Sequence, residues 1–307
     1  MTVQWPTAPL FVPAHKADLR AKAIERRYRA LILDLEDAVP PDQKTIARDA
    51  AKAFVLAHPN VAFVRVNPLN ISTAFSLPFG EDDIAAVVQH GLVGVILPKV
   101  EASADVITAD HLISGAERSQ GIVSNTITMV ALIESARGIS MLSEITSARI
   151  TRPWCLAFGA ADFTTDIGVT WSPDELESQT ARALLVIASR AAGLPPPIDS
   201  AYPDIKNIEH IRASALRARA AGFGAKFAIH PVQVGTFEAA FNPAADEIAW
   251  ADKVLAGLSK AESQGAGAFT VDGRLVDYPI VERARRIRAQ ASVQDLIGTR
   301  SGERVKR

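Results

Sequence analysis

Two carboxylates stand where apolar segments of the chain end. Glu134 follows the apolar segment 128–133, and Asp162 comes shortly after the apolar segment 155–158. An apolar segment of this length bounded by turn-forming residues is typical of a buried strand in a parallel sheet. Carboxylates at one end of such a sheet predict a site for Mg²⁺ or Mn²⁺, because no cluster of His and Cys that would favour zinc accompanies them. The alternative is that each is a helix cap or a solvated acid at a strand end.

Further charged residues lie inside or directly after other apolar segments. Asp34, Arg65 and Lys99 are the clearest cases, and an unpaired charge in such surroundings is costly. Pairing of Arg65 or Lys99 with Asp34, Glu36 or Asp37 would explain them structurally. A functional explanation is that Arg65 beside a metal ion helps to bind an α-keto or α-hydroxy acid and to stabilise an enolate. That is carbon–carbon bond chemistry next to a carbonyl group.

Two other reactive residue types are interpreted as structural. His230 is the only histidine at a predicted strand end, and Pro231 follows it directly. Cys155 is the only cysteine and lies within an apolar segment, where a small buried side chain is expected. A single cysteine excludes a disulfide within the chain, which suits a reducing compartment.

The positions of these residues depend on a repeated alternation of strand-like and helix-like segments. Eight apolar, strand-like segments cover residues 10–13, 30–35, 62–66, 94–100, 127–133, 154–158, 197–201 and 227–230. Amphipathic, helix-like segments between them include residues 17–29, 42–57, 81–90, 175–192 and 207–221. Eight such repeats are typical of a (β/α)8 TIM barrel, in which chemistry gathers at the C-terminal ends of the strands. An open doubly wound sheet fits less well, because no Gly-x-Gly-x-x-Gly follows the first strand.

The barrel is predicted to occupy residues 1–242, and residues 243–307 form a C-terminal helical extension. The extension has helix-like segments at 245–263 and 280–290. Between them lie the small-residue segment Gly265-Ala266-Gly267-Ala268, the turn Asp272-Gly273, and Asp277. We expect this Gly-rich hairpin to be a mobile lid or an arm that reaches a neighbouring subunit.

The composition excludes several classes of partner. The formal net charge of −1 gives no electrostatic basis for binding nucleic acid or an anionic membrane. The apolar segments are far shorter than the ~20 residues that cross a bilayer, and the N-terminus lacks the features of a signal peptide. We therefore expect a soluble, cytoplasmic protein that acts on a small-molecule substrate.

Several motifs occur together in a fixed order. They are Leu10-Phe11-Val12-Pro13, Asp34-Leu35-Glu36-Asp37-Ala38-Val39, Arg65-Val66-Asn67, Pro98-Lys99-Val100-Glu101, Ala131-Leu132-Ile133-Glu134-Ser135 and Phe158-Gly159-Ala160-Ala161-Asp162. Ile198-Asp199, Tyr202-Pro203-Asp204, Gly222-Phe223-Gly224-Ala225-Lys226, Ile229-His230-Pro231-x-Gln233 and Val276-Asp277-Tyr278-Pro279 extend the pattern. In this order they resemble the citrate lyase β-subunit-like family, within the larger HpcH/HpaI aldolase superfamily. The resemblance covers about residues 9–290, and the conjunction of motifs is specific although each motif alone is weak.

The resemblance implies a Mg²⁺-dependent TIM barrel that cleaves or forms β-hydroxyacyl thioesters, usually of coenzyme A, such as malyl-CoA, citramalyl-CoA or citryl-CoA. It implies that Glu134 and Asp162 are the metal ligands and that Arg65 binds the keto or carboxylate oxygen. It also implies that Glu36 and Asp37 hold metal-bound waters and neighbouring side chains.

Asp277 resembles an aspartate that enters the site of an adjacent subunit as acid and base, which implies an oligomer, commonly a trimer. The chain departs from the family near the first strand, with Thr7-Ala8 in place of Arg-Ser and Ala14 in place of Gly. Those positions lie near the expected binding place of the thioester and its nucleotide. Lys16 is the candidate for a phosphate contact there, together with His15, and Lys99 is a further candidate for substrate binding.

Three other activities are compatible with these residues. One is a class II, pyruvate-type aldolase that acts on free 4-hydroxy-2-keto acids, and another is a thioester hydrolase. The third is a citrate lyase β-type subunit that works only with an acyl carrier protein partner. The intact set of Arg65, Glu134, Asp162 and Asp277 argues against a scaffold without activity.

Overall fold

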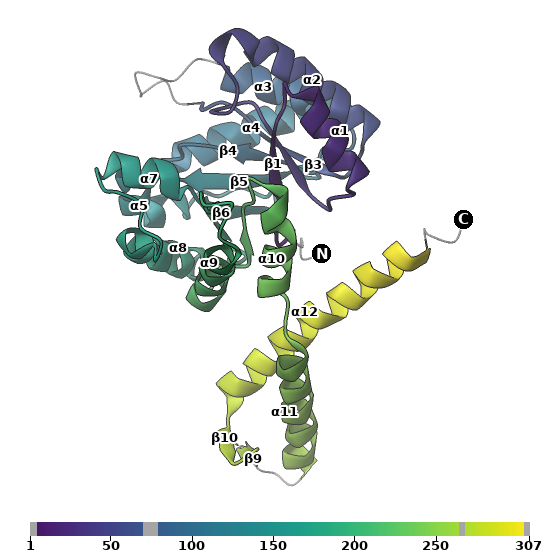
Figure 1. The fold of residues 1–307 in the computed structure, drawn as a ribbon, viewed down its shortest axis with the longest axis vertical. Coiled ribbons are helices and arrows are strands. Elements are labelled where there is room, and N and C mark those ends of the chain that lie inside the picture. The colour runs from purple at the N-terminus through teal and green to yellow at the C-terminus, as the bar shows by residue number, and fades with distance from the viewer. Residues whose placement is uncertain (1–4, 70–78, 264–267, 304–307) are drawn as a thin grey trace. The chain divides into compact units, whose positions relative to one another are not determined.

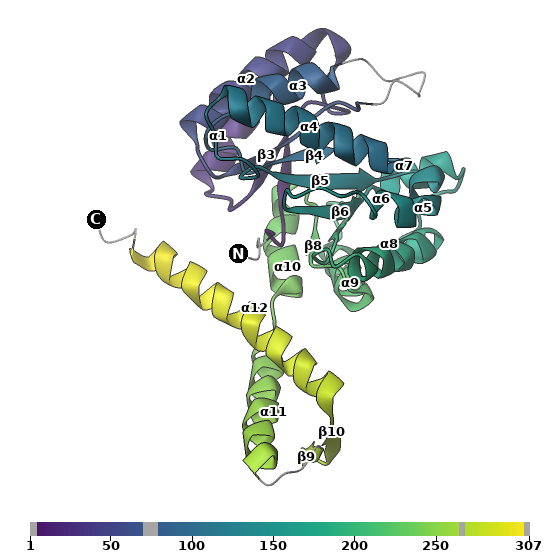
Figure 2. The ribbon, with the colours of Figure 1, turned by 180° about the vertical axis from the view of Figure 1, so that it is seen from behind.

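The computed structural model describes residues 5–69, 79–263 and 268–303. The chain divides into two compact units, Met1–Phe241 and Asn242–Arg307, which Figures 1 and 2 show from opposite sides. Residues Gly265, Ala266 and Gly267 of the predicted small-residue segment lie outside the described residues.

The first unit is a barrel of parallel strands paired in the order β1 to β8. The strands are β1 (Leu10–Pro13), β2 (Leu31–Asp34), β3 (Ala62–Arg65), β4 (Gly94–Leu97), β5 (Thr128–Ile133), β6 (Trp154–Phe158), β7 (Ile198–Asp199) and β8 (Ala225–Lys226). The ends of this sheet meet, because Leu10 pairs with Ala228 and the Lys226 amide donates to the Thr7 carbonyl at 3.0 Å. The prediction of a (β/α)8 barrel is confirmed.

Helices connect successive strands of the barrel and cover its outside (Figure 1). They are α1 (Ala17–Glu25), α2 (Lys44–Ala57), α3 (Gly80–Val87), α4 (Ser103–Ser119), α5 (Ala136–Ser140), α6 (Leu142–Ile145), α7 (Ala160–Asp166), α8 (Gln179–Ala191), α9 (Ile208–Ala221) and α10 (Pro231–Phe241). In α2 the buried residues Ala47, Ala51, Phe54 and Val55 recur at helical spacing, so one face of the helix packs on the sheet. Asp49 and Lys52, between them, lie exposed on the other side.

Alternation along the strands decides which side chains face the barrel interior. One apolar cluster contains Ile32, Phe63 and Leu132, whereas their neighbours in sequence belong to the larger cluster under the helices. Since side chains alternate with a period of two, a residue two positions later faces the same side. Asp34, Arg65 and Glu134 therefore point inward at the C-terminal mouth of the barrel.

The eighth strand begins earlier than the sequence predicted. It comprises Ala225–Lys226 rather than residues 227–230, although the Phe227 amide still donates to the Asp199 carbonyl at 2.9 Å. The prediction was wrong because a lysine was not expected inside a strand. Lys226 is fully buried and pairs with Asp199, which also accepts a hydrogen bond of 2.7 Å from Arg182. Its charge is compensated within the helix–sheet layer, so the strand tolerates it.

The second unit consists of α11 (Ala245–Ser263), a hairpin of β9 (Phe269–Val271) and β10 (Arg274–Val276), and α12 (Tyr278–Glu303). Asp272 and Gly273 form the turn with φ of 49° and 76°, the conformation that a two-residue hairpin turn requires. Ala251, Val254, Val276, Val281 and Ala284 form its separate apolar core. The final helix is longer than the predicted segment 280–290.

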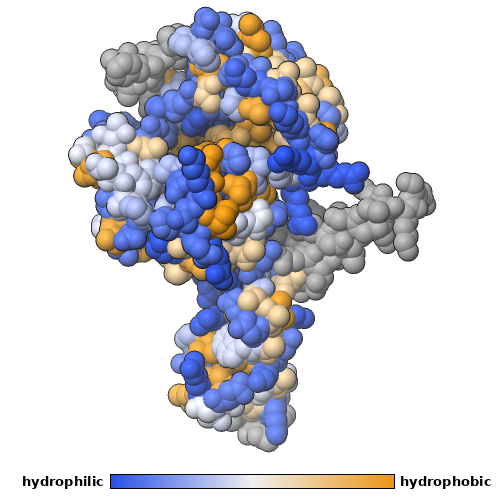
Figure 3. Space-filling view, in the orientation of Figure 1, coloured by the Kyte–Doolittle hydropathy of each residue, from blue (hydrophilic) through white to orange (hydrophobic). Residues whose placement is uncertain are grey.

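Charged and polar side chains lie among apolar ones over most of the face shown in Figure 3, with one continuous hydrophobic area on the barrel unit. Among the described residues, no helix combines the length and apolar character that crossing a membrane would need.

Candidate active site

Arg65 lies at the mouth of the barrel and is held rigidly by Asp34. Its Nε and Nη2 atoms donate to the two carboxylate oxygens of Asp34, each at 2.7 Å. The guanidinium carbon also lies 4.9 Å from the centre of the Phe11 ring. Asp34 and Arg65 meet because they are the last residues of the neighbouring strands β2 and β3 and lie opposite each other in the strand register. Such a two-point contact fixes the plane of the guanidinium group.

Glu36 lies on the turn after β2 and bridges two cations. Its carboxylate lies 2.9 Å from Nη1 of Arg65 and 3.0 Å from Nζ of Lys99. Asp37 lies further out, with its carboxylate 3.6 Å from Arg65 and 3.9 Å from Lys99. The side chain of Glu36 is only 5% exposed, whereas that of Asp37 is 57% exposed. The buried acid thus joins the two basic side chains, and the exposed acid lies at the entrance.

Lys99 contacts the acids that follow β2 and also the two predicted metal ligands. Its Nζ atom lies 3.8 Å from the carboxylate of Asp162, in addition to its contacts with Glu36 and Asp37. Its backbone amide donates to Oε1 of Glu134 at 2.8 Å. Lys99 has a φ of 54°, a left-handed conformation that is uncommon for residues other than glycine. A strained backbone at this position directs the amide to the predicted metal ligand.

Glu134 follows β5 and is buried, with only 4% of its surface exposed. Its neighbour across the sheet is Gly159, where an added Cβ atom would lie 2.5 Å from Oε2 and 2.6 Å from Cβ of Glu134. A side chain at residue 159 would therefore displace the glutamate. Asp162 lies in the first turn of α7 and is 44% exposed.

The cluster contains more acids than bases. The carboxylates of Asp34, Glu36, Asp37 and Asp162 contact the side chains of two cations, Arg65 and Lys99, and the fifth, Glu134, accepts from the backbone amide of Lys99. Among the described residues, no group of three or more His, Cys, Asp or Glu side chains forms a ready-made metal cage. A set of acids with surplus negative charge fits a hard cation that keeps several waters, as Mg²⁺ does. Glu134 and Asp162 could hold such an ion from the side that faces Lys99.

The pKa values reflect this surplus of negative charge. The pKa of Glu36 is raised to about 7, because the effects of burial and of the Asp37 carboxylate exceed the lowering by Arg65 and Lys99. Burial also raises the pKa of Glu134 well above its usual value, and the nearby carboxylates of Glu36 and Asp162 add to that increase. The pKa of Asp34 is lowered despite its burial, because Arg65 stabilises the ionised form.

Six of the eight predicted site residues come together in this cluster: Glu36, Asp37, Arg65, Lys99, Glu134 and Asp162. Arg65 pairs with Asp34, Glu36 and Asp37, and Lys99 pairs with Glu36 and Asp37, as the structural explanation of these charges predicted. Lys16 lies exposed at the start of α1, after β1, and makes no ion pair with a described residue. The neighbouring His15 has a buried Nδ1 atom without a hydrogen-bond partner among the described residues.

Asp277 belongs to the second unit, where it directly precedes α12. Its carbonyl oxygen accepts hydrogen bonds from the amides of Ile280 and Val281, each at 3.1 Å. Its side chain is exposed and forms no hydrogen bond or ion pair with any described residue. The exposed side chains of Leu275 and Tyr278 lie on either side of it in sequence, 64% and 71% exposed. The role of Asp277 as acid and base stays a prediction.

Lys44 was missed by the sequence interpretation. It is the first residue of α2, is 7% exposed, and donates to the backbone carbonyls of Leu35 and Glu36. A signal was available, because a cation is unfavourable in the first turn of a helix and needs a specific partner there.

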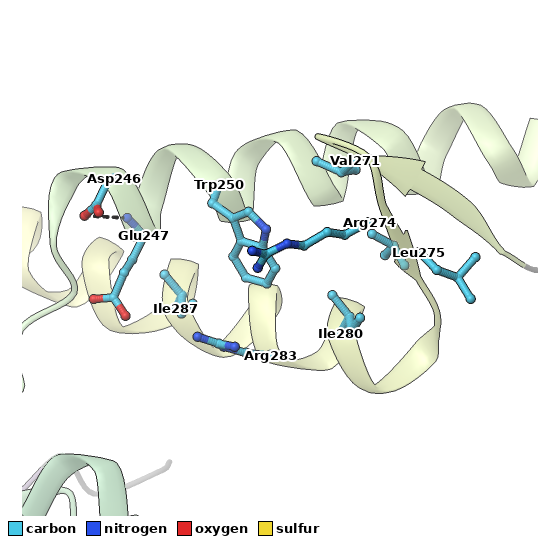
Figure 4. A pocket seen from close by; sticks show the side chains of 10 residues that line it. Asp246, Glu247, Trp250, Val271, Arg274, Leu275, Ile280, Arg283 and Ile287 are labelled. Carbon is cyan, nitrogen blue, oxygen red and sulfur yellow. Dashed lines mark hydrogen bonds between the residues drawn. The ribbon is translucent and has the colours of Figure 1, made fainter. Parts of the chain in front are cut away.

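The second unit also contains a cavity of about 330 Å³ between α11, the hairpin and α12. Figure 4 shows the Trp250 ring next to the guanidinium group of Arg274, with Ile280 and Arg283 contributed by α12. The cavity is lined by Asp246, Glu247, Trp250, Val271, Arg274, Leu275, Val276, Ile280, Arg283 and Ile287. None of the predicted site residues lines it.

Fold and site together define a TIM-barrel enzyme whose acidic cluster lies at the C-terminal mouth of the barrel. Residues 8–231 match the family model for HpcH/HpaI aldolase/citrate lyase, and the chain belongs to this family.

The relatives are lyases and match almost the whole chain. The citrate lyase subunit beta of Haemophilus influenzae is 32% identical over 292 residues, covering 93% of this chain and 97% of the relative. The L-malyl-CoA/beta-methylmalyl-CoA lyase of Rhodobacter capsulatus is 33% identical over 313 residues, covering 92% of this chain and 94% of that relative. This chain is therefore an enzyme of a lyase family that includes CoA-ester lyases.

Solved structures agree with the fold. The CitE protein of Mycobacterium tuberculosis, in complex with magnesium, acetoacetate and coenzyme A, has a TM-score of 0.74 and 29% identity, covering 94% of this chain and 98% of that one. The citrate lyase beta subunit of the same organism, complexed with oxaloacetate and magnesium, has a TM-score of 0.61 and 28% identity. The match covers 78% of this chain and 97% of that one. Magnesium is thus bound within the family.

Proposed function

We propose that this protein is a Mg²⁺-dependent lyase that cleaves a β-hydroxyacyl thioester of coenzyme A into a keto acid and a shorter acyl thioester. The observation that carries this proposal is the gathering of Glu36, Glu134 and Asp162 around Lys99, next to a fixed Arg65. Relatives with lyase activity on malyl-CoA, and a solved relative with magnesium and coenzyme A, support the same reaction class.

In the proposed mechanism Glu134 and Asp162 hold the cation, which when bound supplies positive charge to the keto and carboxylate oxygens of the substrate. Mn²⁺ has the same ligand preferences and is the alternative ion. Arg65 donates to the substrate oxygen that becomes a keto group, because Asp34 holds its guanidinium plane and engages only two of its five N–H groups. Pre-organised donors of this kind need no rearrangement when charge develops.

The chemical step moves one proton off the substrate and returns one to it. The β-hydroxyl loses its proton, the bond between the α- and β-carbons breaks, and the resulting thioester enolate takes up a proton at the α-carbon. Glu36, with a pKa of about 7, can exchange a proton near neutral pH. Asp277 is the proposed acid and base at the α-carbon, contributed by a neighbouring subunit in a homo-oligomer, with a trimer favoured.

Lys16 is proposed to contact a phosphate of the nucleotide, and Lys99 to contact the substrate. Lys16 is exposed on the β1 side of the mouth, so a long anionic substrate could reach it without displacing a core residue. The small side chain of Ala14, at the family's glycine position, is fully buried. The cytoplasmic location and the lack of a nucleic-acid partner stay predictions from composition.

The test is a Mg²⁺-supplemented screen of malyl-CoA, citramalyl-CoA and citryl-CoA beside free 4-hydroxy-2-keto acids. Release of keto acid together with a shorter thioester, without free thiol, would support the lyase proposal. Cleavage of the free acids alone would reject the thioester, and release of free CoA thiol would indicate a hydrolase. Turnover only after addition of an acyl carrier protein would indicate a citrate lyase β-type subunit.

A further inference from the structure

Lys44 is a buried cation whose hydrogen bonds go to the turn that carries Glu36. Its Nζ atom donates to the carbonyls of Leu35 at 2.7 Å and Glu36 at 2.8 Å. A third hydrogen bond of 2.8 Å goes to Oδ1 of Asn67. An ammonium group has three hydrogens, so all of them are used.

The same turn is held from its other side by Asp34. The carboxylate of Asp34 accepts hydrogen bonds from the amides of Glu36 at 3.0 Å and Ala38 at 3.3 Å. Lys44 thus holds the carbonyl groups of this turn while Asp34 holds its amides. With both kinds of backbone group occupied, the turn has few ways to rotate.

Asn67 connects this arrangement to the end of β3. Its Nδ2 atom donates to the Leu35 carbonyl at 3.1 Å and to Oδ2 of Asp83 at 2.6 Å. Asn67 lies two residues after Arg65, so the turn of Glu36 and the strand end of Arg65 share one buried network. Asn67 is 3% exposed and Asp83 is fully buried, which excludes water from these contacts.

We propose that Lys44 is a positioning residue that fixes the turn 35–38 so that the Glu36 carboxylate meets both Arg65 and Lys99. It does not touch the reacting atoms. Its catalytic consequence rests on the proposed lyase function, whereas its effect on the turn does not. Removing its ammonium group leaves Oδ1 of Asn67 without a donor and takes one of two donors from each carbonyl. The Leu35 carbonyl keeps only Nδ2 of Asn67 at 3.1 Å, and the Glu36 carbonyl keeps only the Val39 amide at 2.9 Å, so the turn is held less firmly.

Hydrogen exchange measures this effect without any reaction. In Lys44→Met we expect the amides of Glu36 and Ala38 to exchange at least about 10-fold faster than in the wild type, because the turn opens more often. Lys226→Met is the matched control, since it also removes a buried ammonium group but in the helix–sheet layer of β8. It should lower the melting temperature without changing exchange in the turn.

Kinetics then separate positioning from general stability. Lys44→Met should lower kcat by about 10–100-fold, as loss of a supporting hydrogen bond around a catalytic group does, with KM changed less than about 3-fold. In a Glu36→Gln background the same substitution should cost less than about 3-fold, because the two residues act through one group. If Lys44→Met does not fold, Lys44→Gln, which keeps an N–H donor, replaces it in the hydrogen-exchange and kinetic comparisons with the wild type.

Unchanged exchange in the turn, or an equal loss of kcat in both backgrounds, would overturn the proposal for Lys44. A wild-type protein that cleaves no thioester, but whose turn exchanges faster in Lys44→Met, would contradict the proposed function alone. The two failures are therefore distinguishable.

Discussion

Among single residues, Gly159 limits where Glu134 can lie. Its amide donates to the Ile133 carbonyl at 2.9 Å, so its backbone is tied to the strand that precedes the glutamate. A Cβ atom there would meet both Oε2 and Cβ of Glu134 at distances that real atoms do not adopt. Because Cβ of Glu134 is fixed by the backbone of β5, the glutamate cannot simply rotate away.

The first prediction follows from this contact. Gly159→Ala should weaken Mg²⁺ binding by about 10–100-fold, because a displaced ligand oxygen no longer meets the ion. Isothermal titration with MgCl₂ measures the change. Gly115→Ala in α4 is the matched control, since its Cβ would have only an ordinary contact of 3.8 Å with Arg118. Equal Mg²⁺ affinity in both variants would refute the proposed role of Glu134 as a ligand.

The second prediction concerns pH. Burial raises the pKa of Glu36 from 4.5 to about 7, so the folded protein keeps a proton that the unfolded chain loses between these values. The free energy of unfolding therefore falls as pH rises through this window, by up to about 3 kcal/mol for this group. In the metal-free protein, Glu36→Gln should gain stability relative to the wild type between pH 5 and about 8.

Urea titrations at several pH values measure the difference between wild type and Glu36→Gln. Saturating Mg²⁺ should make this difference in unfolding free energy depend less on pH, because a nearby positive charge lowers the pKa of the Glu36 carboxyl group. A difference that stays constant over this pH range would show that Glu36 is ionised throughout.

Residue spacing was sufficient to predict most of the cluster, because acids and bases at the ends of parallel strands must meet at one mouth. Glu36, Arg65 and Glu134 were found in this way. Lys44 was not found, because its place at the start of a helix signals only that it needs a partner. Two of its three acceptors are backbone carbonyls, which leave no mark in the sequence. The need for Gly159 came from a contact between β5 and the end of β6, which no local pattern expresses.

At the scale of elements, strand length and helix ends were predictable where apolar patterns were uninterrupted. β1 and β6 occupy the predicted residues 10–13 and 154–158, and Gly222 ends α9 with a φ of 107°. The prediction was wrong at β8, where the buried Lys226 breaks the apolar pattern. Tertiary pairing with Asp199 allows this lysine to lie in a strand.

The third prediction concerns how closely β4 packs against its neighbours. A Cβ atom on Gly94 would lie 2.3 Å from Oγ1 of Thr128 and 2.9 Å from two ring atoms of Phe63. Gly94→Ala should therefore lower the free energy of unfolding by about 1–3 kcal/mol, as overpacking does. Urea denaturation followed by circular dichroism measures this change. A loss no larger than that of Gly115→Ala would show that the strand has spare room.

At the scale of the whole molecule, the proposed acid and base, Asp277, and the acidic cluster belong to different units of the chain. The barrel contains the acidic cluster, whereas Asp277 lies on the hairpin side of α12 with a free, exposed carboxylate among the described residues. Exposed Leu275 and Tyr278 beside it offer apolar surface for a neighbour. The arm predicted from the sequence therefore has an available acid at its end.

The fourth prediction is complementation between inactive chains. Asp277→Asn and Glu134→Gln should each abolish turnover, and Asp277→Asn should bind Mg²⁺ normally. When both variants are co-expressed, about one quarter of the wild-type activity should return, because an intact site then forms from two different chains of a homo-oligomer. Mixed oligomers without activity would show that each chain must supply its own aspartate.

The central claim is that Glu134 and Asp162 hold the ion on which turnover depends. Calorimetric titration of Mg²⁺ into the wild type, Glu134→Gln and Asp162→Asn, with thioester cleavage measured on the same samples, tests it most directly. We predict one Mg²⁺ per wild-type chain, and loss of both binding and turnover in each variant at unchanged far-ultraviolet circular dichroism. A folded variant that retains both Mg²⁺ binding and turnover would contradict the claim.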